Sequence, residues 1–237
     1  MNHQLLLPRD GDVLEHAKLL SGLREQIRPT LVGILLLTLL TGIAFPLVLG
    51  ILALPLFSHQ AEGSLVTSDG VVVGSEVIGQ SFSGPKYFHS RPSAAGDGYD
   101  ATVSGGTNLG PVNPKLRDGA KGDPADPAKS KPFAGVRQLA EAYRPSNGLR
   151  PDAAIPIDAV TRSGSGLDPH ISPANAAMQV PRVARERKLN EEGMRRLVAE
   201  HTKGRQLGFL GAPRVSVLSL NLALDRLAPR SSSIPNN

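Results

Sequence analysis

The stretch PTLVGILLLTLLTGIAFPLVLGILALPLF, residues 29–57, decides the fold of this chain. It holds no charged residue over its whole length, whereas about 20 apolar residues are enough for a helix to cross a bilayer. A helix also satisfies its own backbone groups where no water is present. The sequence therefore predicts one transmembrane helix near the N-terminus.

Small and rigid residues interrupt this stretch. Pro46 lies near its middle, where the missing backbone N–H removes one hydrogen bond and predicts a kink. Gly42 and Gly50, like Gly33, thin the helix and would let a partner helix approach closely. Glycine is also common in membrane helices that have no such partner, so both interpretations stay open here.

The main alternative to a retained anchor is a cleaved signal peptide, whose apolar core spans about 7–15 residues. Here the apolar run is about twice as long, and 28 residues precede it. Residues 14–27 carry spaced leucines that suggest a short amphipathic lead-in helix. These features favour a retained anchor.

Flanking charges predict the orientation of the anchor. Lys18, Arg24 and Arg28 precede the span, and acidic residues follow it before the first basic residue, Lys86. By the positive-inside rule, residues 1–28 are expected to be cytoplasmic and residues 58–237 external. In a bacterium the span would lie in the inner membrane and the external part in the periplasm.

Composition sets limits on the external part. The 237-residue chain has no cysteine and a formal net charge of +5, so it uses neither disulfides nor thiolate metal sites. The apolar fraction of 40% is too high for wholesale disorder. The 25 glycines and 20 prolines favour ordered loops over a helical bundle. We expect an α+β fold class, with the membrane helix followed by one loop-rich mixed α/β domain.

Residues 63–79 hold β-branched runs around a Ser-Asp-Gly turn, which predicts a β-hairpin. Residues 115–155 are rich in proline and lack periodicity, so we expect a loop insertion with one short helix at 133–143.

Helices are predicted toward the C-terminus. Ser172 and Pro173 form an N-cap and first-turn proline, and Pro181 is expected to break or kink that helix before a second piece at 182–189. Asn190 caps a further helix, which Gly204 is expected to end. Residues 215–227 fit both the strand and the helix period, and their length and Ala/Leu content favour a helix.

Two compact Gly/Ser/Asn stretches stand out, SGGTNLGPVNP at 104–114 and SGSGLDPHISP at 163–173. The first is a poor phosphate loop, because neither a lysine nor a helix start follows its glycine pair. The second holds the residue types of a hydrolytic triad within a few positions, whereas triads converge from distant segments. An Asp-Pro turn is favoured. A membrane-anchored external hydrolase using Ser163 or Ser165 with His170 remains the alternative function.

The sequence gives little support for a metal ion or a nucleic acid as a ligand. His89, His170 and His201 lack metal-ligand spacing. Residues 182–214 are rich in Lys and Arg, but nucleic acid is not expected outside the membrane. A solvated helix face, or a surface near lipid or partner charges, is favoured.

Ordered blocks along residues 28–227 resemble the C subunit of the Kdp-type potassium-transporting P-type ATPases. They are TGIAFPLV, GSLV, VGSEVIGQSF, YFHSRPSA, SGGTNLGPVNP, SGSGLDPHISPANA, QVPRVARERKL and FLGAPRVSVLSLNLALD. The chain departs from the family pattern at residues 1–20 and at 115–155, where the family has a shorter and more helical connection.

The resemblance implies a non-catalytic accessory subunit of a high-affinity potassium uptake pump, needed for assembly. Its implied partners are a channel-like potassium-binding subunit, a P-type ATPase subunit that hydrolyses ATP, a small single-helix subunit and the lipid bilayer. The family is described as a catalytic chaperone that raises the ATP affinity of the ATPase subunit. No cofactor bound by this chain itself is expected.

The residues expected to form an interface or a structural motif lie in the two compact stretches. We expect Gly164 and Gly166 to allow unusual backbone angles, Asp168 to lock a turn and Ser172 to cap a helix. In the span, Gly42, Pro46 and Gly50 are expected to dock against partner helices. The complete candidate set outside the span is Gly105, Gly106, Asn108, Ser163, Gly164, Ser165, Gly166, Asp168, His170 and Ser172.

Overall fold

The computed structural model describes residues 10–122 and 131–227, with side chains from residue 22 onward. The chain divides into two units, Met1–Glu62 and Gly63–Asn237. Parts of the predicted N-terminal segment and of the predicted insertion, residues 1–9 and 123–130, lie outside the described residues. The first unit is helical and the second is a mixed α/β domain, which we call the outer domain after its predicted location.

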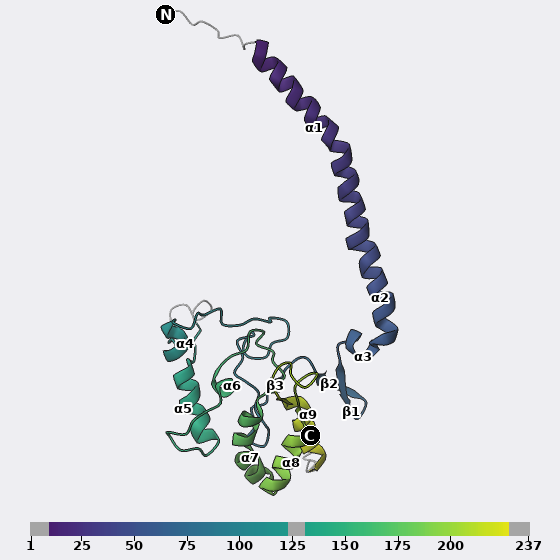
Figure 1. Cartoon of the computed structure of the whole chain (residues 1–237). Helices are drawn as coiled ribbons and strands as arrows, with labels where there is room; N and C mark the ends of the chain where they lie inside the picture. The colour runs from purple at the N-terminus through teal and green to yellow at the C-terminus, as the bar shows by residue number, and fades with distance from the viewer. Residues whose placement is uncertain (1–9, 123–130, 228–237) are drawn as a thin grey trace, which may run out of the picture. The chain divides into compact units, whose positions relative to one another are not determined.

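The first unit is one long helix with a short helix after it (Figure 1). It comprises α1 (Asp10–Leu37), a π-helical segment η1 (Thr38–Ala44), α2 (Phe45–Leu56) and α3 (Ser58–Ala61). Within Gly22–Leu56, an 18-residue window reaches a mean hydropathy of 2.5, and none of that window is buried by the described rest of the chain. The predicted long apolar N-terminal helix is confirmed, and it begins well before residue 29.

Pro46 lies in the first turn of α2, immediately after the π-helical segment. A π-helix pairs residues five apart, and such segments occur where the regular α-helical ladder is disturbed. Thr41 Oγ1 also donates to the Leu37 carbonyl at 2.7 Å within this segment. The helix therefore changes its hydrogen-bond spacing next to the proline and continues beyond it.

The predicted hairpin is confirmed. Strands β1 (Leu65–Ser68) and β2 (Val71–Ser75) pair antiparallel, with a bulge between Val66 and Thr67. Asp69 and Gly70 both have positive φ, at 52° and 78°. A two-residue turn of this kind matches the right-handed twist of the strands it joins.

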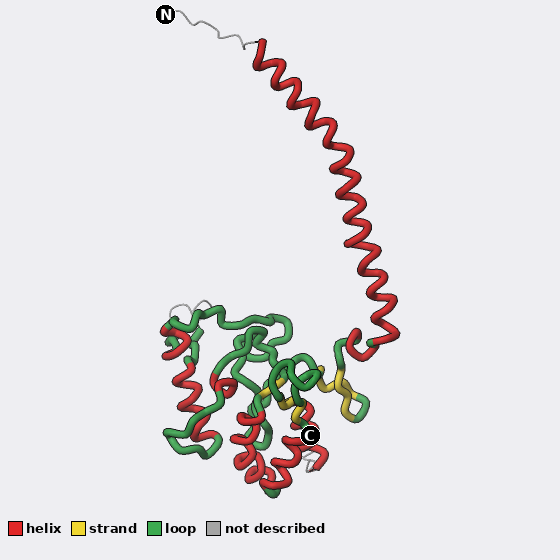
Figure 2. Tube along the Cα trace, viewed as in Figure 1, coloured by secondary structure: helices red, strands yellow, loops and turns green. Residues whose placement is uncertain are grey.

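A second, three-stranded sheet has the order β3-β5-β4, formed by β3 (His170–Ile171), β5 (Arg214–Ser216) and β4 (Thr202–Lys203), all antiparallel. Loops make up much of the outer domain (Figure 2). This agrees with the loop-rich α+β prediction and with the high glycine and proline content.

Two helices, α7 (Pro173–Arg187) and α8 (Glu191–Glu200), follow the predicted caps, and a third, α9 (Val217–Leu227), lies further along the chain. Ser172 Oγ accepts from the Asn175 N–H at 3.1 Å, and Asn190 Oδ1 accepts from the Glu192 N–H at 2.8 Å. In each case the cap satisfies a backbone donor that the first helical turn leaves unpaired.

The predicted break at Pro181 was wrong, because α7 is one helix through that residue. The alternative, a kink at Pro181, stays a prediction. The neighbours of Pro181, Val180 and Arg182, are both buried. Packing on either side outweighs the one hydrogen bond that proline removes.

Two further boundaries differ from expectation. Helix α8 ends at Glu200 and not at Gly204, because Thr202 and Lys203 pair with β5. The segment 215–227, predicted as a helix, begins instead at the end of strand Arg214–Ser216, and the helix starts at Val217.

The predicted insertion contains two helices among its described residues, α4 (Pro114–Asp118) and α5 (Val136–Ser146), before α6 (Ile157–Val160). The helix expected at 133–143 therefore starts three residues late. Phe133 instead forms a β-bridge with Ala120, and Gly135 is the N-cap of α5.

The core of the outer domain packs α7, α8 and α9 against β3, β5 and Phe88. Phe88 is fully buried. Its N–H donates to Asn221 Oδ1 and its carbonyl accepts from Asn221 Nδ2, both at 2.9 Å. A buried amide on α9 thus replaces the strand partner that this loop residue lacks.

Candidate functional site

The two Gly/Ser/Asn stretches lie side by side, although about 60 residues separate them in sequence. The Gly105 N–H donates to the Ser165 carbonyl at 2.8 Å, and Ser104 Oγ donates to the same carbonyl at 3.0 Å. A Cβ on Gly106 would lie 2.9 Å from the Gly164 carbonyl oxygen. We call this pairing the glycine joint.

Gly166 requires its glycine identity for two reasons. Its φ is +69°, and a Cβ there would lie 2.6 Å from the Gly105 carbonyl oxygen and 2.8 Å from Ala95. Ser93 Oγ donates to the Gly166 carbonyl at 2.6 Å. The unusual backbone angle predicted at this position is present.

Gly164 differs from that expectation, because it is absent from the positions with positive φ and a Cβ on it would meet no atom within 4 Å. Asn108, by contrast, has a φ of 52°, in the left-handed region that asparagine tolerates. The positions with an unusual backbone angle or no room for a Cβ are therefore Gly106, Gly166 and Asn108.

Asp168 locks the turn, as expected. Its Oδ1 accepts from the His170 N–H at 2.9 Å, and its Oδ2 pairs with Arg91 Nη1 at 2.8 Å. Burial alone would raise the pKa of the Asp168 carboxyl, but hydrogen bonds from His170 and Arg91 outweigh it and hold the pKa below its ordinary value. The carboxylate therefore stays charged at neutral pH.

Tyr99 supports the same turn. Its hydroxyl donates to the Arg91 carbonyl at 2.8 Å, and burial raises the pKa of Tyr99 to about 12. Neither Arg91 nor Tyr99 is among the candidate residues predicted from the sequence. Arg91 lies within the block YFHSRPSA, so a signal for it was present, but nothing local predicted its partner 77 residues away.

A buried polar network continues from the turn into α7. Asp158 accepts from Ser172 Oγ and the Ser172 N–H, both at 2.8 Å, and from Asn175 Nδ2 at 3.0 Å. Asn175 Oδ1 then accepts from Gln179 Nε2 at 3.0 Å. The expected N-cap Ser172 is thus itself oriented by a carboxylate on α6.

The network ends at Arg182, which is 3% exposed. Its guanidinium donates to Asn147 Oδ1 at 3.0 Å, to Gln179 Oε1 at 2.8 Å and to the carbonyls of Pro85 and Tyr87. All four acceptors are neutral. Burial lowers the pKa of Arg182, although an arginine remains charged at neutral pH.

A shallow hollow of about 350 Å³ opens beside the Asp168 turn. Charged side chains of both signs line it together with apolar ones. They include Arg91, Asp158, Asp168, His170 and Arg214, with Ile157, Ile171 and Pro213. Such a mixed surface suits contact with a protein surface of matching charge.

The residue types of a hydrolytic triad do not assemble into one. Ser165 Oγ accepts from the Leu167 N–H at 3.1 Å and so serves a local turn. His170 Nδ1 lies 3.7 Å from Asp168 Oδ1. Within residues 22–122 and 131–227, no hydrogen bond joins Ser163 or Ser165 to His170, whereas a nucleophile and its base need one.

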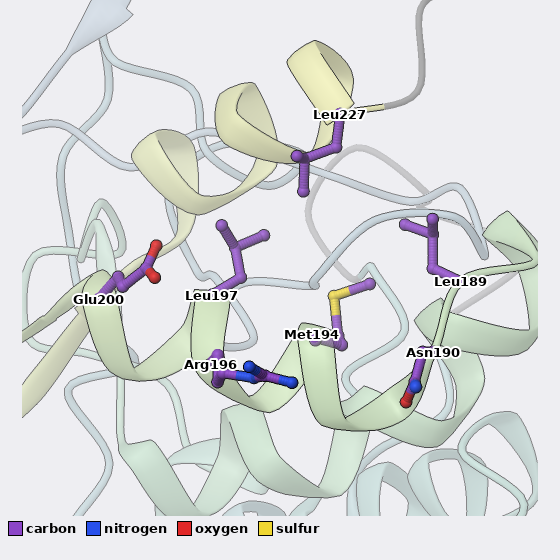
Figure 3. A pocket seen from close by; sticks show the side chains of 8 residues that line it. Leu189, Asn190, Met194, Arg196, Leu197, Glu200 and Leu227 are labelled. Carbon is purple, nitrogen blue, oxygen red and sulfur yellow. The ribbon is translucent and has the colours of Figure 1, made fainter.

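The same described side chains contain no group of three or more His, Asp or Glu placed to hold a metal ion. An apolar groove of about 410 Å³ lies between α8 and the end of α9 (Figure 3). Leu189, Met194, Leu197 and Leu227 point into it. Asn190, Arg196 and Glu200 also line it.

Comparison with known proteins shows the family of the chain. The family model for KdpC, the K+-transporting ATPase c chain, matches residues 27–226. The chain belongs to the KdpC family. The predicted resemblance is thereby confirmed over both the apolar helix and the outer domain.

Several members of the family are similar over most of their length. The potassium-transporting ATPase KdpC subunit of Koribacter versatilis (strain Ellin345) is 51% identical over 192 residues, covering 81% of this chain and 90% of that one. That of Mycobacterium bovis (strain BCG / Pasteur 1173P2) is 48% identical over 205 residues, covering 86% and 100%. That of Rhodopseudomonas palustris (strain BisB18) is 48% identical over 213 residues, covering 85% and 98%.

Proposed function

We propose that this chain is a non-catalytic accessory subunit of an ATP-driven potassium uptake pump, required for assembly and stability of the complex. The observation that carries the proposal is the family match over residues 27–226. In this proposal a channel-like subunit selects potassium and a P-type ATPase subunit hydrolyses ATP. A small single-helix subunit is a further candidate partner.

In the proposed topology residues 1–28 are cytoplasmic, residues 29–57 span the inner membrane and residues 58–237 are periplasmic. The basic residues before the span support this orientation. In the described part of the span, a Cβ on Gly50 would meet no atom within 4 Å, and one on Gly42 would touch only a threonine methyl group. These glycines therefore leave room for a partner helix.

The proposed role of the glycine joint is to present the hollow beside Asp168 as a rigid contact surface for the channel-like subunit. Hydrogen bonds and a partly buried ion pair hold its loops from several directions, as a preformed interface requires. An external domain cannot touch cytoplasmic ATP. An effect on ATP affinity would therefore have to pass through the membrane subunits, with different contacts in at least two pump states.

The experiment is co-purification of the assembled complex. Ile157 on the rim of the hollow is 72% exposed, so Ile157→Asp should leave the outer domain folded. We expect it to lower recovery of the partner subunits and their potassium-stimulated ATP hydrolysis. Val71→Asp, at a position 64% exposed that lies outside both compact stretches and outside the hollow, is the matched control. Equal recovery with both variants would reject the hollow as the interface, and full assembly and activity without this chain would reject the accessory role.

A further inference from the structure

A loop between β4 and β5 displays apolar side chains to solvent. Leu207 is 82% exposed, Phe209 69% and Leu210 47%. Exposed side chains of this size usually mark a surface that binds something when they occur together. We call residues 205–211 the knob.

The knob is an ordered loop. Gln206 and Leu210 exchange two backbone hydrogen bonds of 2.9 Å, and Arg205 Nη1 donates to the Gly211 carbonyl at 2.7 Å. Its backbone therefore closes on itself and holds Leu207 and Phe209 away from the core.

The knob also carries backbone strain. Leu207 has a φ of +52°, a conformation that leucine rarely adopts, and Gly208 and Gly211 have positive φ as well. Strain of this kind concentrates at binding loops, where a fixed display of side chains matters. The display of Leu207 and Phe209 is thus maintained at a conformational cost.

The base of the knob lies beside the point where the chain enters the outer domain. Gly63, the first residue of that domain, accepts through its carbonyl from Ser75 Oγ at 2.6 Å. The residue after Ser75, Glu76, pairs with Lys203 at 3.7 Å, and Lys203 ends β4, shortly before the knob. Contacts within the outer domain thus connect its tethered end to the knob.

The tether is short. Six residues separate Leu56, the last residue of α2, from Gly63. Even if extended, this segment could span no more than about 25 Å. If the span lies in a bilayer, this tether keeps the edge of the outer domain within about 25 Å of the end of α2.

Basic residues flank the knob along the chain. They are Lys203, Arg205 and Arg214, and the sequence has no Asp or Glu between Glu200 and Asp225. Because Lys203 pairs with Glu76, the net positive charge beside the knob comes from Arg205 and Arg214. The hairpin at the same edge adds exposed Leu65, Val71 and Val72. Apolar side chains flanked by basic ones are typical of segments that lie in the interface of an anionic membrane.

We propose that the knob inserts Leu207 and Phe209 into the surface of an anionic phospholipid bilayer, as a second membrane contact of the outer domain. Arg205 and Arg214 would meet the phosphate groups. This inference rests on the membrane anchor and not on the proposed accessory role, so it can be tested on the full chain without partner subunits.

The chain has no tryptophan, so Phe209→Trp provides a single fluorescent reporter at an exposed position. The full-length variant is reconstituted in phosphatidylglycerol-containing vesicles and, separately, in pure phosphatidylcholine vesicles. Lipids doxyl-labelled near the headgroup serve as quenchers. Val112→Trp, on another exposed loop of the outer domain, is the matched control.

We expect the Phe209→Trp signal in the anionic vesicles to be quenched about twofold or more relative to Val112→Trp, and quenching to weaken in phosphatidylcholine. Adding Leu207→Asp to the reporter should reduce the quenching. Equal quenching of the two reporters would overturn the proposal. It would also be overturned if the Phe209→Trp reporter became shielded from iodide only in the assembled complex, because the knob would then bind a protein partner.

Discussion

Alanine at Gly166 tests whether the glycine joint depends on close backbone packing. A left-handed φ costs a residue with a Cβ about 1–2 kcal/mol. The Cβ would also lie 2.6 Å from the Gly105 carbonyl oxygen, so backbone must move, and such overpacking costs about 1–3 kcal/mol. Together these predict that Gly166→Ala lowers the free energy of unfolding of the outer domain by about 3 kcal/mol.

Gly164 supplies the control within the same loop. Its φ is not positive, and a Cβ there would meet no atom within 4 Å. Gly164→Ala is therefore expected to change the free energy of unfolding by less than about 1 kcal/mol. We expect a small increase, because alanine reduces the conformational entropy of the unfolded chain.

The assay is pulse proteolysis of the full-length chain in detergent across a urea series, which follows cleavage of the unfolded outer domain. The membrane helix does not need to unfold for this signal. Equal stability of Gly166→Ala and the unmodified chain would refute the reasoning. Equal damage from both alanines would refute it too, because the loss would then not come from the angle and clash at residue 166.

Three further changes are open to the same proteolysis assay. Arg182→Met should lower the free energy of unfolding by about 3–5 kcal/mol, because it leaves buried acceptors without a donor. Arg195→Met, on an exposed helix face, is the control and should cost less than about 0.5 kcal/mol. Similar losses from both variants would contradict the stabilising role given to Arg182. Gly193→Ala should add about 0.5–1 kcal/mol, because its Cβ meets no atom within 4 Å in α8, and a loss would disprove this. Burial lowers the pKa of His89 below 6.5, so the unfolded chain binds more protons than the folded chain. The free energy of unfolding should therefore fall as the pH drops below about 6.5. If His89→Gln has the same dependence of stability on pH, His89 is not its cause.

Local chemistry made several features of the fold predictable from sequence. The uncharged stretch at 29–57 predicted the long apolar helix, and the Asp69-Gly70 turn predicted the hairpin. Ser172 and Asn190 marked helix starts because a cap acts on donors only two or three residues away.

Features that depend on distant partners were not predictable in this way. Pro181 stays inside α7 because its flanks are buried, and Thr202 leaves the helix because β5 pairs with it. Both glycine stretches of the candidate site were recognised, but their pairing through Gly105 and Ser165 was not. Spacing along one sequence carries no record of which loops meet.

The reciprocal hydrogen bonds between Phe88 and Asn221 have a consequence for biosynthesis. The two residues are 133 positions apart, so the core around Phe88 cannot close until α9 has been made. Contacts of such long range make folding slow. The apolar helix, by contrast, is complete after residue 56. We therefore expect membrane insertion to come first and folding of the outer domain to be among the last events, on a chain already held at the bilayer.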